Sequence, residues 1–238
     1  MDKITVSVVS HSHGEMVINL INRLLMFREV SLIVLTINTP ETLKISDNPR
    51  IVCINNQTPK GFGANHNAAF SYCASDYFCV LNPDIELPQN PFPFLINFMK
   101  SYPAEITAPL VLSPNGLVDD SVRIFPTLSR LIFKVLGVSR NDYQITIGMT
   151  TFEPDWFAGM FMLFRSSTYI RLNGFDESYF LYYEDVDICW RAHQLGLKIV
   201  FCPEVSVVHH AQRASRHNFH HMRWHLTSML RYLCKSVE

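Results

Sequence analysis

The first part of the chain alternates between two hydrophobic spacings. Residues 4–9 are β-branched and alternating, which predicts a strand, and residues 15–27 carry apolar side chains at helical spacing. Two further strand-like runs follow at 32–37 and 51–54. This strand–helix–strand order predicts an α/β fold with a parallel sheet and crossover helices.

Polar turns follow two of these elements. Because parallel sheets bind ligands at the carboxyl ends of their strands, Ser10 and His11 are candidates for contact with a nucleotide. Ordinary solvated turn residues are the alternative. Gly61 and Gly63 open the next predicted helix and let backbone N–H groups approach a ligand. That pattern is neither a P-loop nor a dinucleotide fingerprint, and a simple helix start is its alternative.

The run from Tyr77 to Leu81 is apolar throughout, which predicts a central strand. Asn82, Pro83 and Asp84 follow it. Since Pro83 has no N–H and disfavours helix at Asn82, the resulting bend directs the oxygens of Asn82 and Asp84 toward one point. Mg²⁺ and Mn²⁺ take such ligands together with phosphate oxygens. A common Asn-Pro-Asp turn is the alternative.

The middle of the chain predicts both kinds of element. A helix with an early proline is expected at 91–102. Residues 123–137 are basic and apolar and predict a helix after Pro126, whereas 141–151 predicts a loop. Strands are expected at 106–112, 156–164 and 198–202.

The stretch 174–191, GFDESYFLYYEDVDICWR, concentrates acidic and aromatic side chains. Gly174 permits a tight turn that most residues resist. Phe180, Tyr182 and Tyr183 predict a buried or half-buried aromatic wall directly before the acidic residues.

A helix is expected to begin beside this wall and to run to about Leu195. It places Asp185 in the first turn, where the helix dipole favours an ionised carboxylate. Such a carboxylate behind aromatic side chains suits a general base. In the alternative interpretation, Asp185 only caps the helix and Asp187 pairs with Arg191 at the surface.

The last predicted element is an amphipathic helix at 216–235. Its apolar residues recur at three- and four-residue spacing, with basic and aromatic side chains beside them. No acidic residue lies between Glu204 and Glu238. Such a helix suits an anionic membrane surface or a lipid-linked phosphate. A terminal helix docked on the core with a solvated basic face is the alternative.

Composition narrows the functional classes. The 238 residues, 48% of them hydrophobic, suffice for one domain with a full core. A net charge of −1 gives no indication of nucleic-acid binding. We expect a reducing, cytosolic setting, because the six cysteines show no close pairing and no basic-then-apolar leader is visible. No apolar run approaches the about 20 residues of a membrane span.

The order of these signals resembles the family 2 inverting glycosyltransferases with the GT-A fold. The signals are a strand with a polar turn, a GFG helix start, LNPD, WFAG, GFDE, YYEDVDICWR and a late VVHH. More closely, SVRIFPTLSR and RWHLTSMLRYL resemble bacterial rhamnosyltransferases that act on lipid-linked O-antigen precursors.

The resemblance implies one GT-A domain, with a Rossmann-like, mostly parallel central sheet flanked by helices and an amphipathic C-terminal helix. Its nucleotide-sugar-binding half is expected at 1–105 and its acceptor-binding half at 106–205. A basic amphipathic segment is expected at 206–238.

The resemblance also assigns roles to single residues. Asp185 is the expected general base, with Glu184 beside it as a second catalytic residue. Asp84 and His209 are expected to hold Mg²⁺ or Mn²⁺, with His210 a weaker substitute for His209. Donor-binding residues are expected to be Ser10, His11, Asn38, Gly61, Asn67, Asn82 and Asp84. The acceptor is expected to contact Trp156, Gly159 and Arg123.

One departure from the family concerns the donor base. After the second strand the family usually has an Asp-Asn pair, whose Asp contacts the nucleobase. This chain has Ile37 and Asn38 there. The base contact must therefore be made differently, or donor selection is relaxed.

The implied reaction moves L-rhamnose, with inversion, from dTDP-β-L-rhamnose to N-acetylglucosamine on a polyprenyl diphosphate, in the synthesis of lipopolysaccharide O-antigen. The protein is expected in the cytoplasm, peripheral on the cytoplasmic face of the inner membrane through its C-terminal segment. The alternatives are another nucleotide sugar, a metal-dependent nucleotide-sugar hydrolase, and a binding protein without catalysis.

Overall fold

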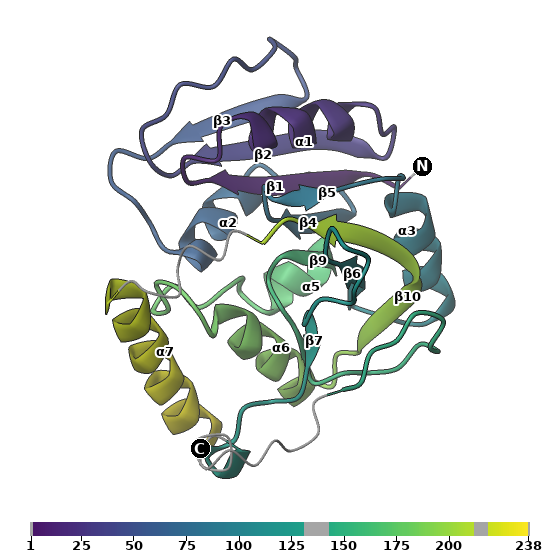
Figure 1. Cartoon of the computed structure of the whole chain (residues 1–238), viewed down its shortest axis with the longest axis vertical. Helices are drawn as coiled ribbons and strands as arrows, with labels where there is room; N and C mark the ends of the chain where they lie inside the picture. Colours follow the sequence, from purple (N-terminus) through teal and green to yellow (C-terminus); the bar gives the residue numbers. More distant parts are fainter. Residues whose placement is uncertain (1, 131–142, 212–218, 238) are drawn as a thin grey trace.

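The computed structural model describes residues 2–130, 143–211 and 219–237 (Figure 1). Within them, eight strands form one sheet in the order β3-β2-β1-β4-β9-β6-β10-β5. The neighbours β1–β2, β2–β3, β1–β4 and β6–β10 are parallel, and β9 and β5 run antiparallel to their partners. The predicted mostly parallel sheet is therefore confirmed. The strands are β1 Ile4–Ser10, β2 Val30–Ile37, β3 Ile51–Asn55, β4 Tyr77–Leu81, β5 Ile85–Glu86, β6 Ile106–Leu112, β9 Phe161–Arg165 and β10 Ile199–His209.

Helices cover both faces of this sheet. One face carries α1 and α3, and the other carries α2, α5 and α6. The C-terminal helix α7 lies at the side of the molecule, next to α6 (Figure 1). The helices are α1 Glu15–Leu25, α2 Phe62–Phe70, α3 Phe92–Ser101, α5 Ser166–Arg171, α6 Glu184–Gln194 and α7 Phe219–Val237.

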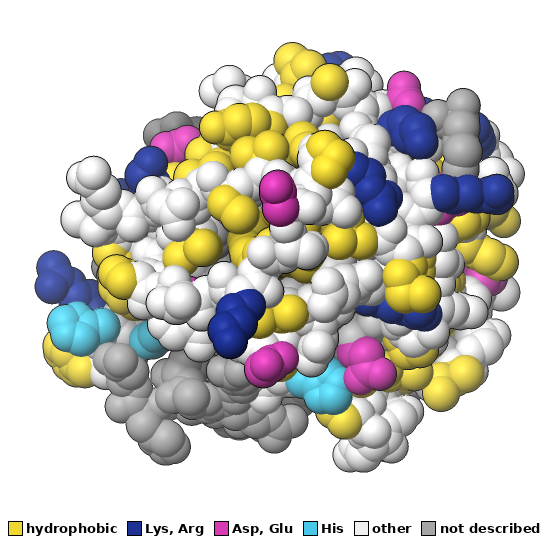
Figure 2. Space-filling view, turned by 90° about the horizontal axis from the view of Figure 1, so that it is seen from above, with side chains coloured by type: hydrophobic (Ala, Val, Ile, Leu, Met, Phe, Trp, Pro, Cys, Tyr) yellow, Lys and Arg dark blue, Asp and Glu magenta, His cyan; other side chains and the backbone are white. Residues whose placement is uncertain are grey.

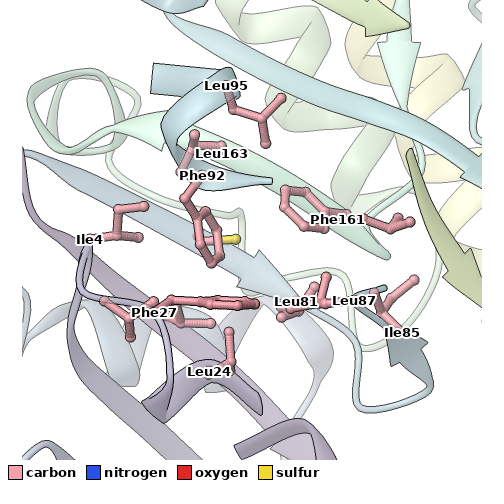
Figure 3. Close-up of a cluster of buried hydrophobic side chains, with 14 of the residues drawn as sticks. Ile4, Leu24, Phe27, Leu81, Ile85, Leu87, Phe92, Leu95, Phe161 and Leu163 are labelled. Carbon is pink, nitrogen blue, oxygen red and sulfur yellow. The ribbon is translucent and has the colours of Figure 1, made fainter. Parts of the chain in front are cut away.

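Figure 3 shows the apolar core between the sheet and α1 and α3. Phe92 of α3 lies edge-on to Phe27, with ring centroids 6.1 Å apart, and 6.2 Å from Phe161 of β9. All three rings are buried, and removing such apolar area from water is the main term that stabilises a fold. This packing keeps the carboxyl ends of β1 and β4 in fixed positions at one edge of the sheet.

Two strand predictions are corrected by the structure. The predicted strand at 156–164 is two strands, because residues 156–157 (β8) pair with residues 122–123 (β7) and residues 161–165 pair with β4 and β6. The predicted strand at 198–202 is only the first part of β10, which continues to His209 past a register shift between Cys202 and Ser206. In both places the choice of partner strand, rather than the local hydrophobic pattern, sets the boundary.

Two predicted segments touch residues that are not described. Most of the helix expected after Pro126 lies outside the described residues. Of the loop expected at 141–151, residues 143–151 contain neither helix nor strand, as predicted.

Candidate active site

Asp84 and His209 meet at the carboxyl edge of the sheet. Asp84 follows β4 and directly precedes β5, which pairs with the end of β10 so that His209 lies opposite Ile85. Nε2 of His209 is 3.3 Å from Oδ2 of Asp84, and both side chains are 12% exposed. The N–H of His210 donates to the Asp84 carbonyl at 2.8 Å and ties the two chain segments together. The structure therefore brings together the two residues predicted as metal ligands.

This pair fits a divalent cation that takes its other ligands from a phosphate. Oδ1 of Asp84 is buried and has no hydrogen-bond partner among the described residues. Over those same residues, no three or more His, Cys, Asp or Glu side chains group in a way that could hold a metal ion. Mg²⁺ is usually bound through one or two carboxylates together with substrate phosphates. A site with two protein ligands thus suits an ion that arrives with a nucleotide diphosphate.

Asp119 belongs to the same site, although the sequence analysis did not name it. Its Oδ2 lies 2.7 Å from Nδ1 of His209, so the ring donates its Nδ1–H there and turns Nε2 toward Asp84. Burial disfavours the imidazolium, but the hydrogen bonds and charges of Asp84 and Asp119 outweigh burial and raise the pKa of His209. An acidic pair, Asp119 and Asp120, soon after the strand at 106–112 is the sequence signal that could have found it.

An unpredicted acid, Glu41, lies beside the predicted donor residues at the ends of β1 and β2. Ser10 is buried, and its hydroxyl donates to Glu41. The same carboxylate accepts hydrogen bonds from the N–H groups of Ser12 and Gly14, each at 3.2 Å. Glu41 thus lies beside Ser10, whose partner in β2 is Ile37, the position where the family usually has its Asp.

Asn38 is buried at the centre of a hydrogen-bond network among loops. Its Oδ1 accepts from the Lys60 N–H and from Nδ2 of Asn56, both at 2.8 Å, and its Nδ2 donates to the Lys60 carbonyl at 3.0 Å. Nδ1 of the exposed His11 lies 3.3 Å from the same Nδ2. The network orders the loops after β1, β2 and β3. Direct contact of Asn38 or His11 with a donor stays a prediction.

Gly61 and Asn67 connect α2 to the acidic stretch. A Cβ on Gly61 would lie 2.6 Å from the Phe180 carbonyl oxygen, which accepts a hydrogen bond from the Phe62 N–H at 2.9 Å. Oδ1 of Asn67 accepts from the Phe175 N–H at 2.9 Å, and its Nδ2 donates to the Phe175 carbonyl at 2.9 Å. Both residues hold the acidic stretch against α2, and donor contact stays a prediction for each.

Asp185 lies in the first turn of α6, as predicted. Its Oδ2 accepts a hydrogen bond from the Gly159 N–H at 3.0 Å, and its Oδ1 accepts one from the Val186 N–H at 2.9 Å. Gly159 lies in the bend between β8 and β9, where a Cβ would lie 3.0 Å from the Phe62 ring. The break in the predicted strand is therefore what brings a backbone donor to Asp185. The N–H of Asn82 donates to the Met160 carbonyl at 2.9 Å and ties this bend to the one after β4.

Burial opposes ionisation at the start of α6. It raises the pKa of Asp185, although the N–H groups of Gly159 and Val186 act in the opposite direction. Burial, with the charge of Asp185, also raises the pKa of Glu184 well above its usual range. The prediction that the helix start helps to keep Asp185 ionised considered only the dipole, whereas burial acts in the opposite direction. A carboxylate with a raised pKa is a stronger base while it remains ionised.

The three predicted acceptor residues gather beside Asp185. Arg123 of β7 pairs with Trp156 of β8, and its guanidinium lies 5.3 Å from the centroid of the Trp156 ring. The charge of Arg123 acts to lower the pKa of Asp185, and Gly159 donates to Asp185 directly. Their contact with an acceptor stays a prediction.

The acidic stretch differs from its prediction in two side chains. Asp187 pairs with Arg191 at 2.7 Å, but Asp187 is fully buried rather than at the surface, and Lys235 of α7 lies 2.6 Å from its other oxygen. Phe180, predicted to be buried or half-buried, is 38% exposed, because its ring packs at a tilt against Trp224 of α7 rather than in the core.

A comparison with known families identifies the class of the protein. Residues 36–166, more than half of the chain, match the family described as Glycosyl transferase family 2. The chain belongs to this family and is a glycosyltransferase.

Two relatives are similar over most of this chain. Rhamnosyltransferase WbbL of Escherichia coli (strain K12) is 35% identical over 186 residues, which are 74% of this chain and 70% of that protein. The N-acetylglucosaminyl-diphospho-decaprenol L-rhamnosyltransferase of Mycobacterium tuberculosis is 32% identical over 168 residues, which are 66% of this chain and 55% of that protein. The chain thus spans little more than half the length of the second relative.

Solved structures confirm the GT-A fold. GalNAc-T7 with UDP, GalNAc and Mn²⁺ superposes with a TM-score of 0.67 at 14% identity, over 89% of this chain and 44% of that one. The mannosyltransferase PcManGT of Pyrobaculum calidifontis, with GDP-Man and Mn²⁺, gives a TM-score of 0.61 at 12% identity, over 97% of this chain and 64% of that one.

Proposed function

We propose that this glycosyltransferase moves L-rhamnose from dTDP-β-L-rhamnose to N-acetylglucosamine on a polyprenyl diphosphate, as a step in O-antigen synthesis. The names of both relatives support the sugar, and the name of the second supports the acceptor. The observation that carries the proposal is the division of the site. Asp84 and His209 form a place for a diphosphate-bound metal, and Asp185 forms a place for an attacking hydroxyl.

Asp185 takes the proton of the acceptor hydroxyl as that oxygen bonds to the anomeric carbon, the bond from this carbon to the diphosphate oxygen breaks, dTDP leaves, and the configuration inverts. The N–H groups of Gly159 and Val186 each hold one oxygen of the carboxylate, so its direction is fixed before the acceptor binds. Arg123 and Trp156, beside it, contact the acceptor sugar. General-base assistance of this kind is worth about 10²–10⁴ in rate.

Asp84 and His209 would hold Mg²⁺ or Mn²⁺ together with the donor diphosphate. When bound, the ion supplies positive charge that offsets the charge developing on the leaving diphosphate. The presence of Mn²⁺ with a nucleotide in both solved neighbours supports a divalent-metal requirement. The hydrogen bond from His209 to Asp119 keeps Nε2 of His209 available to the ion.

A transfer assay tests the reaction. Labelled dTDP-rhamnose is incubated with an N-acetylglucosamine-diphosphate-lipid analogue, with and without EDTA. We expect label to move to the lipid only when metal is available. Release of free rhamnose without an acceptor would instead identify a hydrolase. If dTDP-rhamnose is not consumed, the same assay with other nucleotide sugars identifies the donor.

The C-terminal helix supports a place at the cytoplasmic face of the inner membrane. No helix among the described residues is long and apolar enough to cross a bilayer. On α7, however, Phe219, Met222, Leu226 and Leu230 are between 48% and 71% exposed. Figure 2 shows hydrophobic, basic and histidine side chains gathered at the left edge, where α7 begins. Apolar and basic side chains together suit an anionic membrane surface.

Sedimentation with phosphatidylglycerol vesicles tests this contact. The double variant L226Q/L230Q should bind vesicles several-fold more weakly than the unchanged protein, because it loses two apolar side chains at the surface. The control is I170Q, since Ile170 is 66% exposed and lies on α5 rather than on the exposed apolar face of α7. Equal binding by all three proteins would argue against the membrane role.

A further inference from the structure

The helix α7 has two faces with different surroundings. Its outer face carries Phe219, Met222, Leu226 and Leu230 at three- and four-residue spacing, and all four are exposed. On its inner face Ser228 and Tyr232 are 3% and 2% exposed. The apolar stripe that the sequence pattern picks out is thus largely the face turned away from the protein.

The inner face of α7 contacts the segment that precedes α6. The Ser228 hydroxyl donates to the Leu181 carbonyl at 3.0 Å, and the Tyr182 hydroxyl is hydrogen-bonded to Nδ1 of His221 at 2.9 Å. The rings of Tyr183 and Tyr232 have centroids 5.7 Å apart.

An ion pair extends the contacts of α7 to α6 itself. Nζ of Lys235 lies 2.6 Å from Oδ1 of Asp187 in α6, and 3.0 Å from Oδ2 of Asp176 at the start of the acidic stretch. Hydrogen bonds, stacked rings and ion pairs from one helix therefore reach both ends of residues 176–187.

The segment that α7 holds has an unusual backbone conformation at residues 182 and 183. Tyr182 and Tyr183 have φ values of +70° and +69°, in the left-handed region that non-glycine residues rarely adopt. Such conformations persist only where the surrounding structure holds them. The Tyr183 carbonyl accepts the first hydrogen bond of α6, from the Asp187 N–H at 2.8 Å. The two tyrosines therefore determine where α6 begins, and with it the position of Asp185.

The same segment also contacts the donor side of the site. The Phe180 carbonyl accepts from the Phe62 N–H at 2.9 Å and leaves no room for a Cβ on Gly61. Residues 180–183 thus lie between α7 and the start of α2.

We propose that α7 is a positioning element for Asp185, and that contact of its outer face with an anionic lipid surface raises the turnover number. The inner face holds the strained Tyr182–Tyr183 backbone, and this holds the start of α6. The choice of an anionic lipid follows from charge, because Arg223 is exposed on α7 and no acid lies between Glu204 and Glu238, whereas Arg231 and Lys235 contact the protein itself.

A lipid surface that binds the formed helix stabilises it, and the contacts of the inner face are stabilised with it. A measurement of turnover rests on the proposed function, because it needs a donor and an acceptor. A measurement of hydrogen–deuterium exchange needs neither.

The first test compares two neighbouring hydroxyls of α7. Ser228→Ala removes the hydrogen bond to Leu181, whereas Thr227→Ala changes an exposed hydroxyl on the same turn. In hydrogen–deuterium exchange of the full chain, Ser228→Ala should make the amides of 182–187 exchange about tenfold faster, with little change in β1 and β4. Thr227→Ala should change neither, and Ser228→Thr should restore most of the protection.

The matching kinetic test separates positioning from general instability. Ser228→Ala should lower kcat about five- to tenfold while the donor KM stays within about twofold, because the lost hydrogen bond is to Leu181, which is not among the residues expected to bind the donor. Faster exchange at 182–187 with an unchanged kcat would overturn the positioning role. Equal effects of Ser228→Ala and Thr227→Ala would overturn it as well.

The test of the lipid contact uses phosphatidylglycerol vesicles, with phosphatidylcholine vesicles, which carry no net charge, as the control. Phosphatidylglycerol should slow exchange both along 219–237 and at 182–187, and L226Q/L230Q should lose both effects. Slowing confined to 219–237, or absent, would overturn the activation by lipid. Because exchange is measured without substrate, this result stands even if the transfer assay shows that the donor is not dTDP-rhamnose.

Discussion

Asp185 is the side chain on which turnover is expected to depend most. Asp185→Asn keeps the shape and an oxygen that can accept the Gly159 N–H, but it cannot take a proton. We expect kcat to fall by about 10²–10⁴, with the circular dichroism spectrum unchanged. The raised pKa of Asp185 also predicts that kcat/KM falls on acidification at a higher pH than for an ordinary aspartate. A normal turnover number in this variant would remove Asp185 from the mechanism.

Asp119 offers a test of how His209 is oriented. Asp119→Asn replaces a carboxylate that accepts a hydrogen bond from Nδ1 of His209. Loss of such a partner of a metal ligand typically weakens metal affinity about 10–100-fold. Titration of Mn²⁺ by electron paramagnetic resonance, with dTDP present, measures this directly.

The neighbouring acid is the control for this variant. Asp120→Asn breaks a 2.5 Å ion pair with Arg123 and should leave Mn²⁺ affinity unchanged. An equal loss in both variants would mean that the loop, rather than the hydrogen bond to His209, matters.

Glu184 is expected to cost stability at neutral pH. Its side chain is buried, and Oε2 has no hydrogen-bond partner within the described chain. The pKa of Glu184 is raised in the folded protein. Its protonated form therefore contributes to the free energy of unfolding in full below the unfolded pKa of about 4.3, and this contribution is lost as pH rises toward the folded pKa. Glu184→Gln should therefore gain free energy of unfolding relative to the unchanged protein by up to about 1.4 kcal/mol per pH unit over that window.

Urea unfolding at a series of pH values from 4 upward checks this sign. If the difference between Glu184→Gln and the unchanged protein does not vary with pH, then Glu184 is ionised in the folded state and the argument from burial is wrong.

At the scale of elements, the junction between α2 and the acidic stretch depends on a missing side chain. Gly61 has φ −64° and ψ 161°, which alanine adopts without strain, so Gly61→Ala tests the contact alone. Its Cβ would lie 2.6 Å from the Phe180 carbonyl oxygen, and the backbone must shift. We expect a loss of about 1–3 kcal/mol in stability and a lower kcat.

A glycine without close neighbours gives the comparison. A Cβ on Gly116 would meet nothing within 4 Å, but φ there is +78°, so Gly116→Ala reports backbone strain without a clash. If Gly61→Ala leaves both stability and kcat unchanged, the junction accommodates a side chain and does not constrain the segment.

The bounds of a strand were predictable where a whole hydrophobic run pairs within one sheet. The runs at 77–81 and 106–112 became β4 and β6 with the expected bounds, because each is largely apolar and largely buried within the sheet. The run at 156–164 is equally apolar, yet it divides between two sheets at residues 158–160. Pairing with β7 is a long-range contact, which local spacing does not encode.

At the scale of the whole molecule, the donor and its metal should stabilise the fold by mass action. At dTDP and Mn²⁺ concentrations about 100-fold above the Kd, binding contributes about 2.7 kcal/mol, which corresponds to a rise in Tm of roughly 5–10 °C for a chain of this size. Asp84→Ala should abolish the part of the shift that depends on Mn²⁺, because it removes one of the two proposed protein ligands. A full Mn²⁺-dependent shift in this variant would place the ion elsewhere.

The sequence by itself determined the mostly parallel sheet, the bend at 82–84, the helix that begins at the acidic residues and the family. These follow from hydrophobic period, turn chemistry and the order of short motifs, all of which act between neighbours in the chain. Only the tertiary structure decided that Asp119 orients His209, that Glu41 accepts a hydrogen bond from Ser10 and that the less apolar face of α7 contacts residues 176–187. Each joins residues at least 31 positions apart, and such contacts depend on how the elements pack rather than on any local pattern.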